Sequence, residues 1–148
     1  MMTATARTVA AEPGKDSGRH LIITIHGIRT FGEWQTRLAA LVREKEPRIV
    51  VEHYRYGYFS AIAFLVPWLR RRAVRRFREV LLSAVDSNLW DRIDIVSHSF
   101  GTYIVGNCLL AAAPSLRSLV NTVIFSGSVL KKHFQFTRYF QKMPAFVL

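Results

Sequence analysis

The sequence predicts an α/β fold: a partial, doubly wound parallel sheet of about four strands with flanking helices. Short apolar segments rich in β-branched residues alternate with longer segments of helical periodicity, an order typical of parallel sheets. Two of the strand ends carry turns with chemically suggestive side chains, and ligands bind beyond the carboxyl ends of the strands in such sheets. The 148 residues, of which 50% are hydrophobic, suit one domain with a substantial core.

The first regular segment follows a polar leader of small residues. Residues 1–18 contain a Pro-Gly pair and no continuous apolar stretch of the kind found in signal peptides. We therefore expect a disordered leader followed by one domain over residues 19–148. Residues 20–25 are nearly all apolar, as in a strand that is covered on both faces. A segment of helical periodicity follows the turn after this strand and ends at Pro47.

The middle of the chain contains a second strand and a long basic helix. The strand is expected over residues 48–54. Residues 60–85 have a helical pattern with a break or kink near Pro67. The second half of this helix is amphipathic, with apolar residues on one face and arginines elsewhere. The remaining elements are a strand at 92–96, a helix at 102–113 and a strand at 119–125.

The turn after the third strand carries the most specific motif. Residues 97–101 read Ser-His-Ser-Phe-Gly and follow the G-x-S-x-G pattern of a nucleophile elbow, with serine in the first glycine's place. Strand and helix backbones approach closely at an elbow, so the residues two before and two after the nucleophile must be small. Ser97 and Gly101 meet this requirement. Ser99 is therefore the candidate nucleophile, and a turn serine that caps the following helix is the alternative interpretation.

A second turn lies where the first strand ends, at His26-Gly27. If the first and third strands are neighbours, the backbone N–H groups of Ile28 and Phe100 face Ser99. Such an arrangement is an oxyanion hole, whose donors stabilise the charge that develops in an acyl-transfer transition state.

The two motifs together resemble the α/β-hydrolase superfamily, and within it the bacterial serine esterase and lipase-like branch. Residues 25–35 (Ile-His-Gly-Ile-Arg-Thr-Phe-Gly-Glu-Trp-Gln) and the elbow carry this resemblance, which spans roughly residues 19–130. It implies the strand order second, first, third, fourth. It also implies that Ser99 attacks a small-molecule or lipid ester, with Ile28 and Phe100 as the oxyanion-hole donors. The sequence offers no cofactor motif and no metal-binding spacing of histidine or cysteine.

The rest of the catalytic triad is not evident. In this family an acid and then a histidine follow the serine. No Asp or Glu follows Asp94, and His133 is the only histidine after the elbow. His133 is therefore the candidate general base, without a following acid to orient it. We expect either a fragment or truncated relative of a serine hydrolase, or a relative that has lost catalysis and acts by binding a membrane surface or a protein.

The other titratable residues of the predicted strands and turns are expected to be structural. His98 is expected to support the elbow, because adjacent residues on such a turn point in different directions. His26 is expected to pack within its loop, His20 and His53 to be satisfied strand histidines, and Asp94 to pair with a structural partner.

The charge of the chain suggests a further partner. Lys+Arg 21 against Asp+Glu 10 gives a net charge of +11, which favours anionic partners. The basic segment Arg70–Arg78 follows an apolar stretch too short to span a bilayer, since a span needs about 20 residues. It either lies at an anionic membrane surface or is the solvated face of a core helix. Nucleic-acid binding ranks below both, because no reading motif is present.

The single cysteine bears on the compartment. Cys108 excludes an internal disulfide and suits a reducing environment, so we expect a cytoplasmic protein, with membrane-peripheral association as the variant. A buried thiol used for packing is the expected role of Cys108. The sequence does not indicate an oligomeric state.

Overall fold

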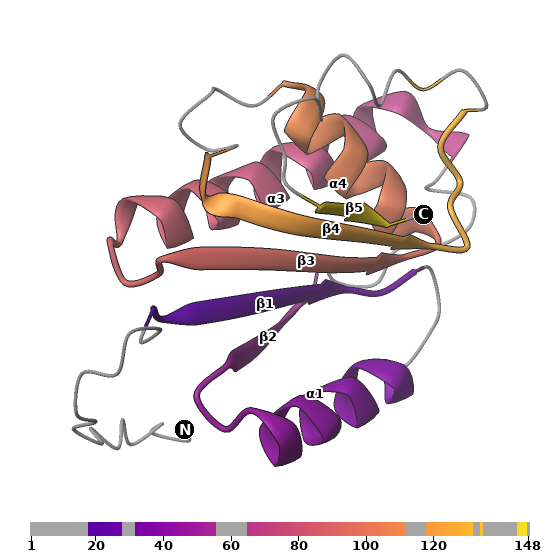
Figure 1. The fold of residues 1–148 in the computed structure, drawn as a ribbon. Helices are drawn as coiled ribbons and strands as arrows, with labels where there is room; N and C mark the ends of the chain where they lie inside the picture. The colour runs from indigo at the N-terminus through magenta and orange to yellow at the C-terminus, as the bar shows by residue number, and fades with distance from the viewer. Residues whose placement is uncertain are drawn as a thin grey trace, which may run out of the picture.

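The computed structural model describes residues 18–27, 32–55, 65–111, 118–131, 134 and 145–147. In this part of the chain, five parallel strands form one sheet in the order β2-β1-β3-β4-β5 (Figure 1). The strands are β1 (His20–Ile25), β2 (Val50–Tyr54), β3 (Arg92–His98), β4 (Val120–Ser126) and β5 (Ala145–Val147). The helices are α1 (Glu33–Lys45), α3 (Pro67–Asp86) and α4 (Phe100–Leu110).

The helices lie on both faces of this sheet. Helix α1 covers one face, and α3 and α4 pack together over the other (Figure 1). The chain runs outward from β1 to β2, returns across β1 to β3, and then continues in the opposite direction to β4 and β5. The winding therefore reverses between β1 and β3. The predicted doubly wound class and the predicted neighbourhood of the first and third strands are both confirmed.

Several boundaries differ from the expectation for physical reasons. Pro67 is the first residue of α3 and not a kink within it, because proline's fixed φ and missing N–H suit the first helical position. Strand β3 continues to His98 and α4 starts at Phe100, so Ser99 alone separates the strand from the helix. The short strand β5 was missed, since three residues are too few for a periodic pattern. The predicted leader, apart from Gly18, and the predicted helical residues 60–64 lie outside the described residues.

The core lies mainly between the sheet and the α3–α4 pair. Phe77 and Leu81 of α3 are fully buried, as are Ile104 and Leu109 of α4. Cys108 of α4 is also buried, and burial raises the pKa of its thiol to about 12, although nearby Arg78 opposes the rise. This thiol packs as predicted and is poorly reactive at neutral pH, because the thiolate is the reactive form. None of the described helices is long and apolar enough to cross a membrane.

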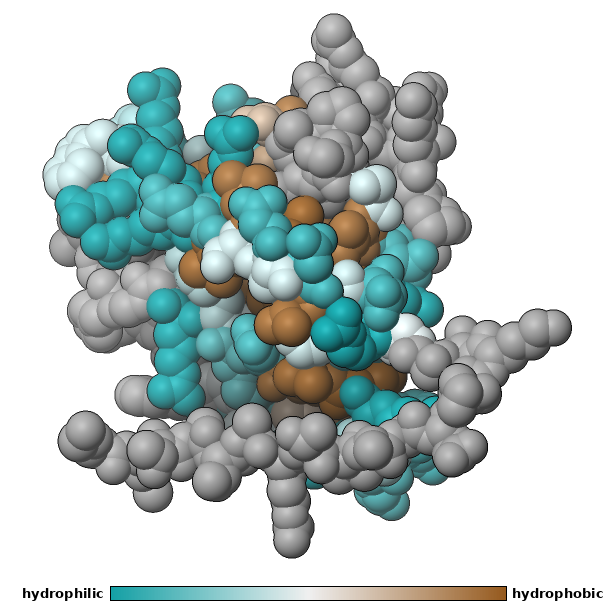
Figure 2. Space-filling model, turned by 90° about the vertical axis from the view of Figure 1, so that its left-hand side faces the viewer, coloured by the Kyte–Doolittle hydropathy of each residue, from teal (hydrophilic) through white to brown (hydrophobic). Residues whose placement is uncertain are grey.

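A polar cluster ties three strands together near their amino ends, the side of the molecule that Figure 2 turns to the viewer. The Asp94 carboxylate of β3 accepts hydrogen bonds from the Arg92 guanidinium at 2.8 Å and from the Thr122 backbone N–H of β4 at 3.0 Å. His20 Nε2 of β1 lies 2.8 Å from the same carboxylate. Burial would raise the pKa of Asp94, but Arg92 and His20 outweigh it and hold the pKa below its ordinary value. Asp94 thus has the structural partners that its place in the strand predicted.

The lowered pKa of Asp94 gives a test of this cluster. A carboxylate whose pKa is lower in the folded state stabilises the fold above its unfolded pKa, and that stabilisation is lost as pH falls below about 4. We expect Asp94→Asn to reduce the free energy of unfolding by about 1–3 kcal/mol at neutral pH and to flatten its decline in acid. Urea unfolding across pH measures both effects. Asp91→Asn is the control, because that side chain is 61% exposed. Equal acid sensitivity of Asp94→Asn and the wild type would contradict the assignment.

Candidate active site

Ser99 occupies a strained turn between β3 and α4. Its backbone has φ 52° and ψ −122°, a conformation that residues other than glycine rarely adopt. Hydrogen bonds hold it there: the Ser99 N–H donates to the Ser126 carbonyl at 3.0 Å, and the Ser99 carbonyl accepts from the Thr102 N–H at 2.9 Å. The Thr102 hydroxyl donates to the same carbonyl at 2.7 Å. The strand-turn-helix geometry expected of an elbow is therefore present.

The side chain of Ser99 does not act as a helix cap. Ser99 stands at the N-cap position of α4, yet it makes no capping hydrogen bond. A capping serine has an extended backbone, and its hydroxyl accepts an N–H from the first turn of the helix. Here the backbone conformation differs, and the carbonyl rather than the hydroxyl of Ser99 engages Thr102. The alternative interpretation of an ordinary capping serine therefore does not describe this turn.

The small residues on either side of the elbow are required by close packing. A Cβ at Gly101 would lie 2.8 Å from the Ile25 carbonyl oxygen, because the first turn of α4 presses on the end of β1. Ser97 is fully buried, and its hydroxyl donates to the Ile124 carbonyl of β4 at 3.0 Å. Serine is therefore accepted in the first glycine's place, since its one polar group is satisfied.

The turn after β1 meets the elbow. Ile25 pairs with Ser97 in the parallel register, which brings Gly27 against Ser99. A Cβ at Gly27 would lie 2.6 Å from Ser99 Cβ and 3.0 Å from Ser99 Oγ. Phe100 begins α4, so the N-terminus of this helix, where N–H groups and the helix dipole favour negative charge, is directly next to Ser99. Ile28, the other predicted oxyanion-hole donor, lies outside the described residues.

The described histidines near the elbow have structural surroundings. The His98 ring faces Trp34 of α1 at a centroid distance of 6.4 Å. Its Nε2 would be 3.3 Å from a Cβ at Gly127, and its buried Nδ1 has no hydrogen-bond partner among the described residues. His26 Nδ1 contacts the Gly27 carbonyl within its own loop. His26 thus contacts its own loop as expected, whereas the supporting role of His98 stays a prediction. His133, the candidate base, lies outside the described residues.

A polar chain that was not predicted supports the start of α1. Gln35 is buried and donates through Nε2 to the Thr24 hydroxyl at 2.7 Å, and Thr24 Oγ1 lies 2.7 Å from His53 Nδ1. The Gln35 N–H also bonds the Gly32 carbonyl, which fixes the point where the loop after β1 enters the helix. Burial, and secondarily Arg55, lowers the pKa of His53 and favours the neutral ring. The available signal was the threonine that interrupts the apolar first strand.

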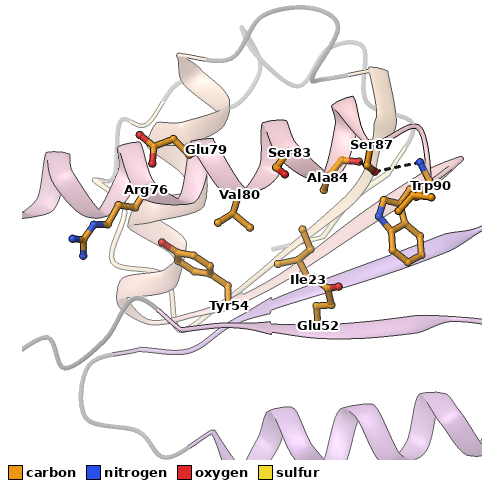
Figure 3. A pocket seen from close by; sticks show the side chains of 11 residues that line it. Ile23, Glu52, Tyr54, Arg76, Glu79, Val80, Ser83, Ala84, Ser87 and Trp90 are labelled. Carbon is orange, nitrogen blue, oxygen red and sulfur yellow. Dashed lines mark hydrogen bonds between the residues drawn. The ribbon is translucent and has the colours of Figure 1, made fainter. Parts of the chain in front are cut away.

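A groove lies apart from the elbow, between α3 and the β2 edge of the sheet (Figure 3). Its volume is about 670 Å³, and no residue of the elbow lines it. Tyr54 and Ile23 line the groove from the sheet, Arg76 and Glu79 line it from α3, and Trp90 lies at the end away from Arg76 (Figure 3). Burial raises the pKa of Tyr54; Arg76 opposes the shift and Glu79 adds to it.

Among the described residues, no group of three or more histidine, cysteine, aspartate or glutamate side chains could hold a metal ion.

Comparison with known proteins places this geometry in a known fold. No protein-family model and no curated protein matches the sequence. Among solved structures, an iodinated complex of acetyl xylan esterase matches with a TM-score of 0.60 at 13% identity, over 74% of this chain and 63% of that one. The catalytic core domain of acetyl xylan esterase from Trichoderma reesei matches with a TM-score of 0.59 at 14% identity, over 76% of this chain and 64% of that one. The chain thus spans less than two thirds of these esterases, and it has a partial α/β-hydrolase fold.

Proposed function

We propose that this protein is a serine hydrolase of the esterase or lipase type, with Ser99 as its nucleophile. The observation that carries the proposal is the strained backbone of Ser99, whose hydroxyl makes no capping bond and faces the closely packed Gly27. Such strain is kept where surrounding structure holds it, and it is concentrated at functional sites. The fold shared with two acetyl xylan esterase structures is consistent with ester chemistry.

The proposed reaction is acyl transfer through a covalent intermediate. Ser99 Oγ attacks the ester carbonyl carbon, the alcohol leaves, and water then hydrolyses the acyl-enzyme. The oxyanion forms at the N-terminus of α4, where the Phe100 N–H stabilises it together with the Ile28 N–H of the loop after β1. Each such donor contributes about 3 kcal/mol to the transition state. His133 takes the proton of the serine hydroxyl in this proposal, a role worth about 10²–10⁴ in rate.

A non-catalytic relative is the second candidate. It is favoured by one observation: among the described residues, no histidine or carboxylate forms a hydrogen bond with the Ser99 side chain. A serine without a base is a weak nucleophile at neutral pH. In that case the elbow would persist as a structural turn, and the protein would act through its surface.

A fluorophosphonate probe separates the two candidates. We expect the probe to label the wild type on Ser99 and to leave Ser99→Ala unlabelled. His133→Ala should slow labelling by about 10²–10⁴ if His133 is the base. Mass spectrometry of the labelled peptide measures the site, and gel fluorescence measures the rate. Protection of the buried Cys108 from a thiol reagent verifies that each variant is folded. Absence of labelling in folded wild type would reject the hydrolase.

A methyl group at Gly27 tests the position of the nucleophile. Because a Cβ there would lie 2.6 Å from Ser99 Cβ, Gly27→Ala must displace the serine or the loop. A displacement of this size is expected to slow probe labelling by about a hundredfold. The control is Gly18→Ala, whose Cβ would meet only the exposed Asp91 side chain at 3.3 Å. Equal labelling rates for Gly27→Ala and Gly18→Ala would disprove the close approach of the two turns.

A further inference from the structure

The first turn of α3 lies at the same rim of the sheet as Ser99. Strand β2 ends at this rim and α3 runs back antiparallel to the strands, so the helix starts near their carboxyl ends (Figure 1). Side-chain contacts with α4 fix this position. The Arg70 guanidinium lies 5.4 Å from the centre of the Tyr103 ring, and that ring stacks on Phe100 at 5.6 Å with an interplanar angle of 15°. Phe100 is the residue that follows Ser99, so a chain of side-chain contacts connects the first turn of α3 to the elbow.

This end of α3 exposes large apolar and cationic side chains together. Leu65, just before the helix, is 73% exposed and Trp68 is 62% exposed. Arg71, Arg72 and Arg75 are also exposed, and they follow Trp68 at three, four and seven positions, a spacing that places all four on one side of the helix. Within the described chain, no carboxylate forms an ion pair with these three arginines. These five residues are called the rim patch below.

The composition of the rim patch matches the interface of an anionic bilayer. Tryptophan and leucine partition into the headgroup region of a bilayer, and arginines are attracted to anionic lipid headgroups. Nucleic acid would use the arginines and a stacked tryptophan, but it gives the exposed Leu65 no apolar environment. We propose that the rim patch docks this protein on the surface of an anionic lipid bilayer, with the Ser99 rim toward the lipid. The docking rests on the patch alone, whereas delivery of a lipid ester to Ser99 rests on the function proposed above.

Vesicle flotation tests the docking without using catalysis. The probes are vesicles of phosphatidylcholine alone and vesicles of phosphatidylcholine with phosphatidylserine. The wild type is expected to float with the second kind only. The triple variant Arg71→Gln, Arg72→Gln, Arg75→Gln should lose about a hundredfold in partition, since each arginine near an anionic surface contributes about fivefold. Trp68→Ser should lose about tenfold with the charge unchanged.

A matched triple variant separates local from overall charge. The variant Arg43→Gln, Lys45→Gln, Arg48→Gln also removes three positive charges, but from exposed positions at and beyond the end of α1. This control should retain wild-type flotation within about threefold, because it lies at the opposite end of the sheet. Ser99→Ala should float like the wild type even though it takes no probe, so a failed hydrolase and a failed docking surface give different results.

Three outcomes would overturn the proposal. The first is that the wild type does not float with vesicles that contain phosphatidylserine. The second is that both triple variants lose the same fraction of binding, which would assign the effect to net charge. Alternatively, a single-stranded RNA would compete the protein off the vesicles and bind it through the same three arginines, which would assign the patch to nucleic acid.

Discussion

The close approach of two turns at the carboxyl ends of β1 and β3 is the constraint on which the site depends. Gly27 and Gly101 leave no room for a side chain, because Ser99 contacts the first and the end of β1 contacts the second. The elbow is therefore held between the β1 turn and α4, and the positive φ of Ser99 is retained despite a cost of about 1–3 kcal/mol. The hydrogen bond that the Ser99 N–H donates to the Ser126 carbonyl, and those that the Ser99 carbonyl accepts from Thr102, offset part of that cost.

The two ends of the sheet carry different groups of polar side chains, and the length of the strands separates these groups. At the amino ends, Asp94 joins β1, β3 and β4 through a guanidinium, an imidazole and a backbone N–H. In this cluster, contacts to the Asp94 carboxylate connect the three neighbouring strands. At the carboxyl ends of β1 and β3, the Ser99 hydroxyl lies next to Gly27 and to the N-terminus of α4, where the helix dipole favours negative charge. A parallel sheet allows this division, because all its strands present the same end to the same rim.

Much of the fold, and the strand-turn-helix geometry at the candidate residue Ser99, could be predicted from the sequence. The β-branched run of β1 and the Ser-His-Ser-Phe-Gly segment have local signatures, so the predictions of a strand and of a strand-turn-helix unit were correct. The adjacency of β1 and β3, which the strand order of the resembling family implied, was also correct. The polar chain from Gln35 through Thr24 to His53 could not be predicted, because it joins three elements and depends on the burial of each side chain. Strand β5 gave no signal for a different reason. A three-residue strand is specified by its neighbour β4 and not by its own periodicity.

The central claim is that a hydroxyl and converging backbone amides meet at one point between β1 and α4. A crystal structure of the protein after reaction with a fluorophosphonate tests this most directly. The account predicts a phosphonyl group bonded to Ser99 Oγ, with its oxygen accepting hydrogen bonds from the backbone N–H groups of Phe100 and Ile28 at about 2.7–3.1 Å. An adduct on another residue, or a phosphonyl oxygen on Ser99 that points into solvent away from both amides, would contradict it.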